Sequence, residues 1–146
     1  YIKGSSLIFN LKRLKKRKIF DENFFFFFEE LDLCRRIKSK NGKIILLNKI
    51  KIDHVGASSS NLKRANYDNF RNWNFFWSRF YYFKKHYGLT HSLIKHSGKF
   101  FRFFLNTLIY YFFSEKKFLM NRYRFLGLYN SILNNSSRKS IKILKP

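Results

Sequence analysis

The chain has 146 residues, of which 31 are Lys or Arg and only 8 are Asp or Glu, so its formal net charge is +23 at pH 7. That length allows one modest domain, and so large a charge favours an anionic partner, namely a nucleic acid, a lipid surface or a phosphorylated substrate. The single cysteine, Cys34, excludes an intrachain disulfide and a cysteine zinc cluster, and the 20 Phe and 9 Tyr argue against disorder up to about Asn130.

The first sixty residues predict a mixed α/β arrangement. Residues 1–10 are typical of a short strand, and a basic connection follows at 12–18. A helix is predicted from about Glu29 to Lys40, where apolar side chains recur at threefold spacing. Lys43–Asn48 has the pattern of a buried strand, and the alternation in Lys49–Asp53 is typical of a partly exposed one.

From about Asn66 the pattern becomes helical, basic and aromatic. One helix is predicted from there to Gly88, a second over His91–Ser114 and a third from Glu115 to about Leu128. The polar, basic residues 134–146 are expected to fray. An apolar stripe at i, i+3, i+4 and i+7 spacing follows the first of these helices: Phe70, Trp73, Trp77, Phe80, Tyr81 and Lys84.

The run 103–114 carries no charged side chain. It is well short of the roughly 20 residues that a helix needs to cross a bilayer. Basic residues precede and follow it, as in a helix that lies in the headgroup zone of a membrane. The alternative is a helical hairpin whose aromatic side chains bury against the α/β part.

Five of the eight acidic residues lie within twelve positions, next to the five phenylalanines 24–28. These acids are Asp21, Glu22, Glu29, Glu30 and Asp32. Concentrated negative charge beside apolar surface raises the proton affinity of carboxylates and is typical of general acid/base sites. The alternative is that acids favour the positive end of the helix that begins here.

Several blocks of the sequence resemble the second half of family-two glycosyltransferases, in particular the bacterial rhamnosyltransferase-like branch. They begin with GSSLI at 4–8, FDENFF at 20–25 and EELDLCRR at 29–36. Further similar blocks follow in the family's order: GKI at 42–44, HVGAS at 54–58, basic-aromatic helical sequence at 71–88 and RFLGL at 124–128. An ordered series of blocks is harder to obtain by chance than one short motif.

The resemblance implies the C-terminal part of an α/β domain of the GT-A type, followed by basic-aromatic helices. It divides the chain into a partial catalytic domain at 1–62, a helical extension at 63–130 and a basic tail at 131–146. The resemblance covers only the family's second half, so a nucleotide-binding half is expected to be missing from the start of this chain. We therefore expect a fragment of a longer enzyme, unable to turn over in isolation.

The resemblance also implies roles for the acidic residues in an inverting hexosyl or rhamnosyl transferase. Glu30 takes the position of the general base, where the family usually has Asp, and the neighbouring Glu29 tunes it or fixes the loop. Asp32 is expected to pair with Arg35 or Arg36 along the helix and to hold that element in place. Asp21 and Glu22 are expected near the acceptor, which also lies next to the base.

His54 and Ser58 fall in the loop that resembles the family's donor-side loop. The resemblance implies that His54 lies near the donor diphosphate or a divalent cation, Mg²⁺ or Mn²⁺, and a neutral imidazole can ligate such a metal. Ser58 is expected to bond phosphate oxygens. The alternatives are a histidine hydrogen-bonded within a turn and a serine that only shapes the bend.

The implied partners are a nucleotide-sugar donor, a glycan or polyprenyl-linked acceptor, and the anionic inner face of the cytoplasmic membrane. The main alternative is a nucleic-acid-binding module, because residues 12–18 and 71–87 combine positive charge with aromatic side chains. The acidic cluster argues against it, so no nucleic acid is expected. A purely structural membrane-associated protein is the third possibility, and a genome poor in G and C would give much of this composition without selection for binding.

Overall fold

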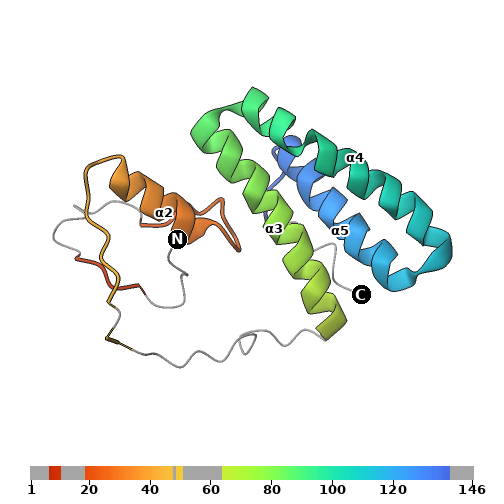
Figure 1. Cartoon of the computed structure of the whole chain (residues 1–146), viewed down its shortest axis with the longest axis horizontal. Coiled ribbons are helices and arrows are strands. Elements are labelled where there is room, and N and C mark those ends of the chain that lie inside the picture. The colour runs from red at the N-terminus through yellow and green to blue at the C-terminus, as the bar shows by residue number, and fades with distance from the viewer. Residues whose placement is uncertain (1–6, 11–18, 48, 51–63, 139–146) are drawn as a thin grey trace.

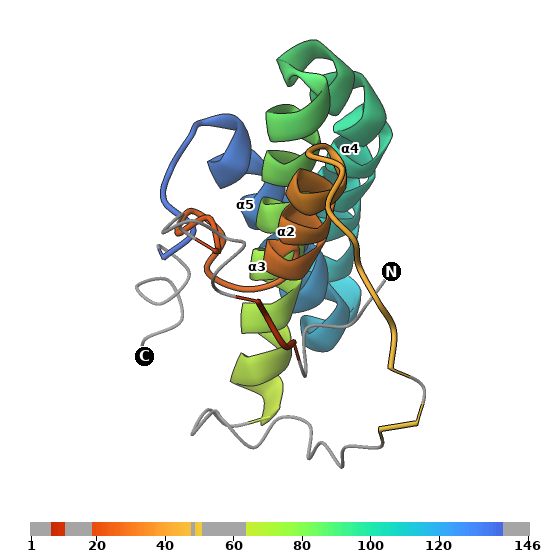
Figure 2. The same ribbon diagram turned by 90° about the vertical axis from the view of Figure 1, so that its left-hand side faces the viewer.

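The described part of the chain is helical. The computed structural model describes residues 7–10, 19–47, 49–50 and 64–138, with the side chains of 64 and 65 left out. Its helices are α2 (Glu29–Lys38), α3 (Arg64–Tyr87), α4 (Leu89–Phe113) and α5 (Glu115–Ile132). Helices α3, α4 and α5 pack on one another, and α2 lies on the side of α3 that faces away from α4 (Figure 1). The view turned by 90° shows α2 lying along α3 (Figure 2).

The predicted α/β fold of the GT-A type is wrong for the residues that the structure describes, which contain no strand. Residues 43–47, predicted as a buried strand, form neither helix nor strand, and Leu46 is 68% exposed. Residues 7–10 are likewise not in a strand. An apolar run becomes a strand only when a neighbour accepts its backbone hydrogen bonds, and no such neighbour lies in the described segments. Most of the second predicted strand, 51–53, falls outside them.

The predicted helices are confirmed, and their ends follow from local backbone chemistry. Helix α2 stops where Asn41 adopts a left-handed φ of 56° and the Gly42 N–H bonds to the Ile37 carbonyl at 2.9 Å. Gly88, with a φ of 90°, separates α3 from α4. The Ser114 side chain accepts a 3.5 Å hydrogen bond from the Lys117 N–H at the start of α5, as an N-cap residue does.

The core lies between α3, α4 and α5. The apolar stripe of α3 supplies Trp73, Trp77 and Phe80, which are buried, and Phe103 and Leu128 meet it from the other two helices. Polar side chains fasten the same interface, because buried backbone groups need partners. Ser131 of α5 donates to the Trp77 carbonyl at 3.0 Å, and the Trp77 indole donates to the Asn135 carbonyl at 2.9 Å.

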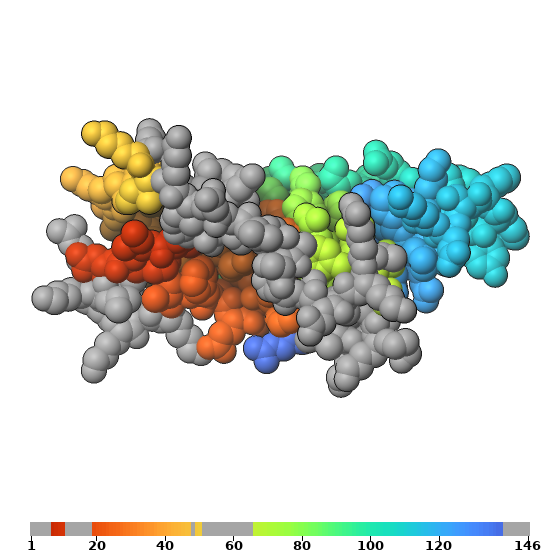
Figure 3. All heavy atoms as spheres, turned by 90° about the horizontal axis from the view of Figure 1, so that it is seen from below, coloured from red at the N-terminus to blue at the C-terminus, as the bar shows by residue number. Residues whose placement is uncertain are grey.

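The segment before α2 packs beside the segment after α5. The Ser137 hydroxyl donates to the Asn23 carbonyl at 2.7 Å, although 114 positions separate the two residues in sequence. In the space-filling view the N-terminal residues (red and orange) gather at one end of the molecule and α4 with α5 (cyan) at the other (Figure 3).

Candidate functional site

The turn that leads into α2 is strained. Phe27 and Phe28 have φ values of 68° and 71°, in the left-handed region that bulky residues rarely adopt. Such a conformation costs on the order of 1–3 kcal/mol at each residue, and it persists only where the surroundings enforce it. Here the rings of both phenylalanines pack on Phe75, and the Ser78 hydroxyl donates to the Phe26 carbonyl at 2.8 Å. Helix α3 thus holds the turn in place.

The strained turn places two adjacent carboxylates, Glu29 and Glu30, at the first turn of α2. Glu30 is 8% exposed. The Oε2 atom of Glu29 is buried and has no hydrogen-bond partner among the described residues. Burial raises the pKa of the Glu29 carboxyl and the charge of Glu30 raises it further, although the Glu29 backbone N–H opposes them. A desolvated carboxylate beside a second one is suited to proton transfer.

Asp32, one helical turn further on, is fully buried in an ion-pair network. Its carboxylate oxygens lie 2.7 Å from Arg36 Nε, 2.7 Å from Lys85 Nζ and 2.8 Å from His86 Nε2. Burial would raise the pKa of Asp32, but the hydrogen bonds from Lys85, Arg36 and His86 outweigh it and lower that pKa. The network joins α2 to the end of α3.

Asp21 joins the same network through Lys85, whose Nζ lies 2.8 Å from Asp21 Oδ2. The Tyr81 hydroxyl also donates to that oxygen, at 3.0 Å. Burial opposes ionisation of Asp21, yet Lys85, the Asn23 N–H and Tyr81 lower its pKa to about 2. Burial and the bond to Asp21 raise the pKa of Tyr81 to about 12. Asp21 is therefore a charged structural anchor at neutral pH.

Four of the described acidic residues fall into two kinds. Asp21 and Asp32 are engaged by cations and hold α2 and the preceding segment on α3, and the pair of Asp32 with Arg36 has the i, i+4 spacing of a helix. Glu30 is buried at the start of α2, and Glu29 has a buried carboxylate oxygen beside it. Environments that push carboxylate pKa values in opposite directions are characteristic of acid/base sites. Glu22, predicted near the acceptor, is exposed.

Three residues of this site were missed by sequence reasoning: Tyr81, Lys85 and His86. They lie in α3, and His86 is 54 positions from Asp32. An acidic cluster in a basic chain indicates that cations will pair with it, but not which ones. Burial lowers the pKa of His86, although its contact with Asp32 opposes that shift.

The predicted donor-side residues His54 and Ser58 lie outside the described residues. Within the described ranges no three His, Cys, Asp or Glu side chains come together as ligands for a metal ion. Asp32, the most buried carboxylate there, has its oxygens engaged by N–H donors. The residue predicted to ligate Mg²⁺ or Mn²⁺, His54, is not among these residues, so the metal remains a prediction.

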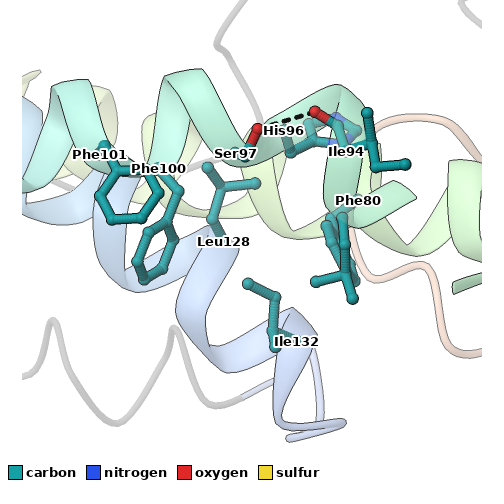
Figure 4. Close-up of a pocket in the computed structure, with 9 residues that line it drawn as sticks. Phe80, Ile94, His96, Ser97, Phe100, Phe101, Leu128 and Ile132 are labelled. Atoms are coloured by element: carbon teal, nitrogen blue, oxygen red, sulfur yellow. Dashed lines mark hydrogen bonds between the residues drawn. The ribbon is translucent and has the colours of Figure 1, made fainter. Parts of the chain in front are cut away.

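Cavities lie beside the helices in the described part of the chain, and two of them bear on the site. One, of about 760 Å³, lies beside the strained turn, and neither Glu29 nor Glu30 lines it. Its lining is charged and aromatic and includes Phe27, Asp68, Arg71, Asn72, Phe75, Glu115 and Lys116. The other, of about 410 Å³, is lined mainly by carbon. Figure 4 shows its wall: Phe80, Ile94, His96, Ser97, Phe100, Phe101, Leu128 and Ile132.

His96 of α4, which lines this second cavity, is 2% exposed. Its Nδ1 lies 2.8 Å from the Ser92 carbonyl oxygen, so Nδ1 carries the hydrogen and the lone pair is on Nε2. Nε2 has no partner among the described residues. Burial lowers the pKa of His96, although the hydrogen bond to the Ser92 carbonyl opposes that shift. The lowered pKa leaves the ring neutral at pH 7.

Comparisons with known proteins do not indicate a function. The grounds for assigning one are the geometry at the start of α2 and the sequence motif at 20–36. The chain matches no protein-family model, no curated protein and no solved structure. Among the described helices, none is both long enough and apolar enough to pass through a lipid bilayer.

Replacing Glu29 by Gln is expected to raise the free energy of unfolding at pH 7. The folded-state pKa of Glu29 lies above the ordinary value of 4.5, so its contribution to stability is present below pH 4.5 and is lost as the pH rises through the folded-state pKa. Glutamine has no carboxyl group to ionise, so Glu29→Gln removes this loss of stability at high pH. Urea unfolding should give a higher midpoint for the variant at pH 7 and equal midpoints near pH 4. An unchanged midpoint at pH 7, as expected for the exposed Glu115→Gln control, would contradict this assignment.

Proposed function

We propose that this chain provides the acceptor-activating part of an inverting glycosyltransferase, with Glu30 as the general base. The single observation that carries the proposal is the arrangement at the start of α2. There the segment FDENFFFFFEELDLCRR presents two shielded carboxylates directly after a strained turn. Backbone strain of this kind is concentrated at functional sites.

In the proposed reaction the ionised Glu30 removes the proton from an acceptor hydroxyl. The hydroxyl oxygen forms a bond to the anomeric carbon of the donor sugar while the bond from that carbon to the nucleoside diphosphate breaks on the opposite face, so the configuration inverts. Glu30 ends protonated and the diphosphate leaves with the electron pair. Glu29, whose pKa is raised, reduces the negative charge beside the base when it is protonated.

The anchoring network serves this reaction by positioning. Lys85 joins Asp21 to Asp32, and both contacts fasten the acidic segment to the end of α3. Glu30 lies two residues before Asp32 in the same short helix. A base must remain within hydrogen-bond reach of its proton, and a fixed α2 keeps it there.

The proposed location is the cytoplasmic face of the cell membrane, with the protein bound peripherally. A net charge of +23 attracts both an anionic lipid surface and the diphosphate of a donor. The proposed acceptor is a glycan or a polyprenyl-linked sugar, whose phosphate lies at such a surface. The absence of a membrane-spanning helix among the described residues is compatible with this placement.

Glu30→Gln is expected to reduce sugar transfer by at least about 100-fold, because a positioned general base contributes roughly 10²–10⁴-fold to rate. The measurement is transfer of labelled sugar from a panel of nucleotide-sugar donors into glycan and lipid extracts, using membranes of cells that produce the whole protein. Glu30→Asp, which keeps the carboxylate, should retain activity.

Asp68→Asn makes the same chemical change at an exposed acid of α3 and is the control. Donor binding, measured separately, should be unaffected in Glu30→Gln. Normal transfer by that variant would remove Glu30 from the role of base.

A further inference from the structure

Helix α4 divides into three faces. One side packs on the core through Ser92, His96 and Phe103, which are buried. A second side carries the basic side chains Lys95 and Lys99, which are followed at helical spacing by Arg102. The helix has no Asp or Glu from its first residue to its last. All of its charge is therefore positive and lies apart from the third face.

That third face, the uncharged face of α4, is apolar and exposed over most of the helix. Its members recur at spacings of three, four and seven: Leu93, Ile94, Phe101, Phe104, Leu105, Leu108 and Phe112. Ile94 is 72% exposed and Phe112 is 82% exposed. Contiguous apolar surface of this extent marks an interaction site on a soluble protein.

The smaller cavity opens on the uncharged face. Ile94 and Phe101 line the cavity and are also among the most exposed apolar side chains of α4 (Figure 4). Leu128 and Ile132 close it from α5. A volume of about 410 Å³ walled by carbon accepts a flexible hydrocarbon chain and offers almost nothing to a polar ligand.

We infer that the uncharged face of α4 lies in the headgroup zone of an anionic bilayer, with the cavity taking up part of one lipid chain. The pattern is that of an interfacial helix: an apolar face, a separate basic side and too little hydrophobicity to cross the membrane. A second copy of the chain would bring another +23 charge against the first, which disfavours self-association. This inference specifies the surface behind the peripheral location proposed above and rests on that part of the proposed function.

The test is flotation of the full chain with phosphatidylcholine vesicles, with and without phosphatidylglycerol. Leu105→Lys places a charge on the uncharged face and is expected to weaken binding by about tenfold or more. Leu46→Lys makes the same change at an exposed leucine outside α4 and should bind like the unmodified chain. Lys99→Gln is expected to weaken binding about fivefold in anionic vesicles and not in neutral ones, since each basic residue near the surface adds a similar increment.

Equal binding by Leu105→Lys and Leu46→Lys would overturn the inference while leaving membrane attachment intact. A dimer that sedimentation detects without lipid, and that Leu105→Lys abolishes, would assign the face to a second copy and also overturn it. If the unmodified chain binds no vesicle, the peripheral location fails as well. Sugar transfer to a water-soluble acceptor, which depends on Glu30, is measured independently of all three results. Circular dichroism of each variant verifies that its helices are intact.

Discussion

Asp32→Asn is expected to lower the free energy of unfolding by about 3 kcal/mol at pH 7, the lower end of what removing one partner from a buried ion pair costs. Asp32 is fully buried, and its three partners come from two helices. The lower end applies because Lys85 keeps its contact with Asp21 and Arg36 keeps its bond to the Ile19 carbonyl. Urea unfolding followed by tryptophan fluorescence measures the change.

The pH dependence of Asp32→Asn provides a second readout with a defined sign. The folded-state pKa of Asp32 is lowered below 3.8, so its stabilisation is present above pH 3.8 and is lost as the pH falls through the folded-state pKa. The difference between the unmodified chain and the variant should therefore shrink below about pH 3.8. Asp21 remains ionised to about pH 2 and loses its contribution last.

The control for this experiment is Asp68→Asn, the same substitution at an exposed position of α3. Surface substitutions of this kind change stability by less than about 0.5 kcal/mol. Equal stability of Asp32→Asn and the unmodified chain at pH 7 would show that the network does not hold α2 on α3.

Gly127→Ala is expected to destabilise the helical bundle by about 2–3 kcal/mol, in the upper part of the range for overpacking. A Cβ atom at Gly127 would lie 2.3 Å from the Trp73 carbonyl oxygen, and that neighbour is backbone. Helices α3 and α5 would have to separate to admit the methyl group. Trp73 and Leu128 lie in the buried interface that would open.

Gly98→Ala is the matched control, because it places the same methyl group on a helix of the same bundle. A Cβ atom at Gly98 meets nothing within 4 Å. The higher helix propensity of Ala should then stabilise the protein by about 0.5–1 kcal/mol. Thermal and urea unfolding should give opposite signs for the two substitutions. A stabilising effect of both would mean that α3 and α5 do not approach as closely as the structure shows.

The acid pair illustrates how far local sequence leads at a candidate site. The clustering of Glu29, Glu30 and Asp32 beside phenylalanines drew attention to one segment, because like charges next to apolar surface are visible without coordinates. The sequence did not show which of these carboxylates are engaged by cations and which are not assigned to such a contact. That distinction depends on contacts with cations from α3, and those contacts span 54 and 64 positions of sequence.

The four helices were readable from the chain because their causes are local: apolar side chains at 3.6-residue periodicity, with Asn41, Gly88 and Ser114 at their ends. The strand predicted over 43–48 is absent from its described part, 43–47, because an apolar run needs a partner strand, and pairing is a relation between distant segments. For the same reason, only the tertiary structure shows that Lys85 contacts both Asp21 and Asp32, and that Gly127 lies against Trp73. Periodicity acts between neighbours in sequence, whereas charge neutralisation and close packing act between neighbours in space.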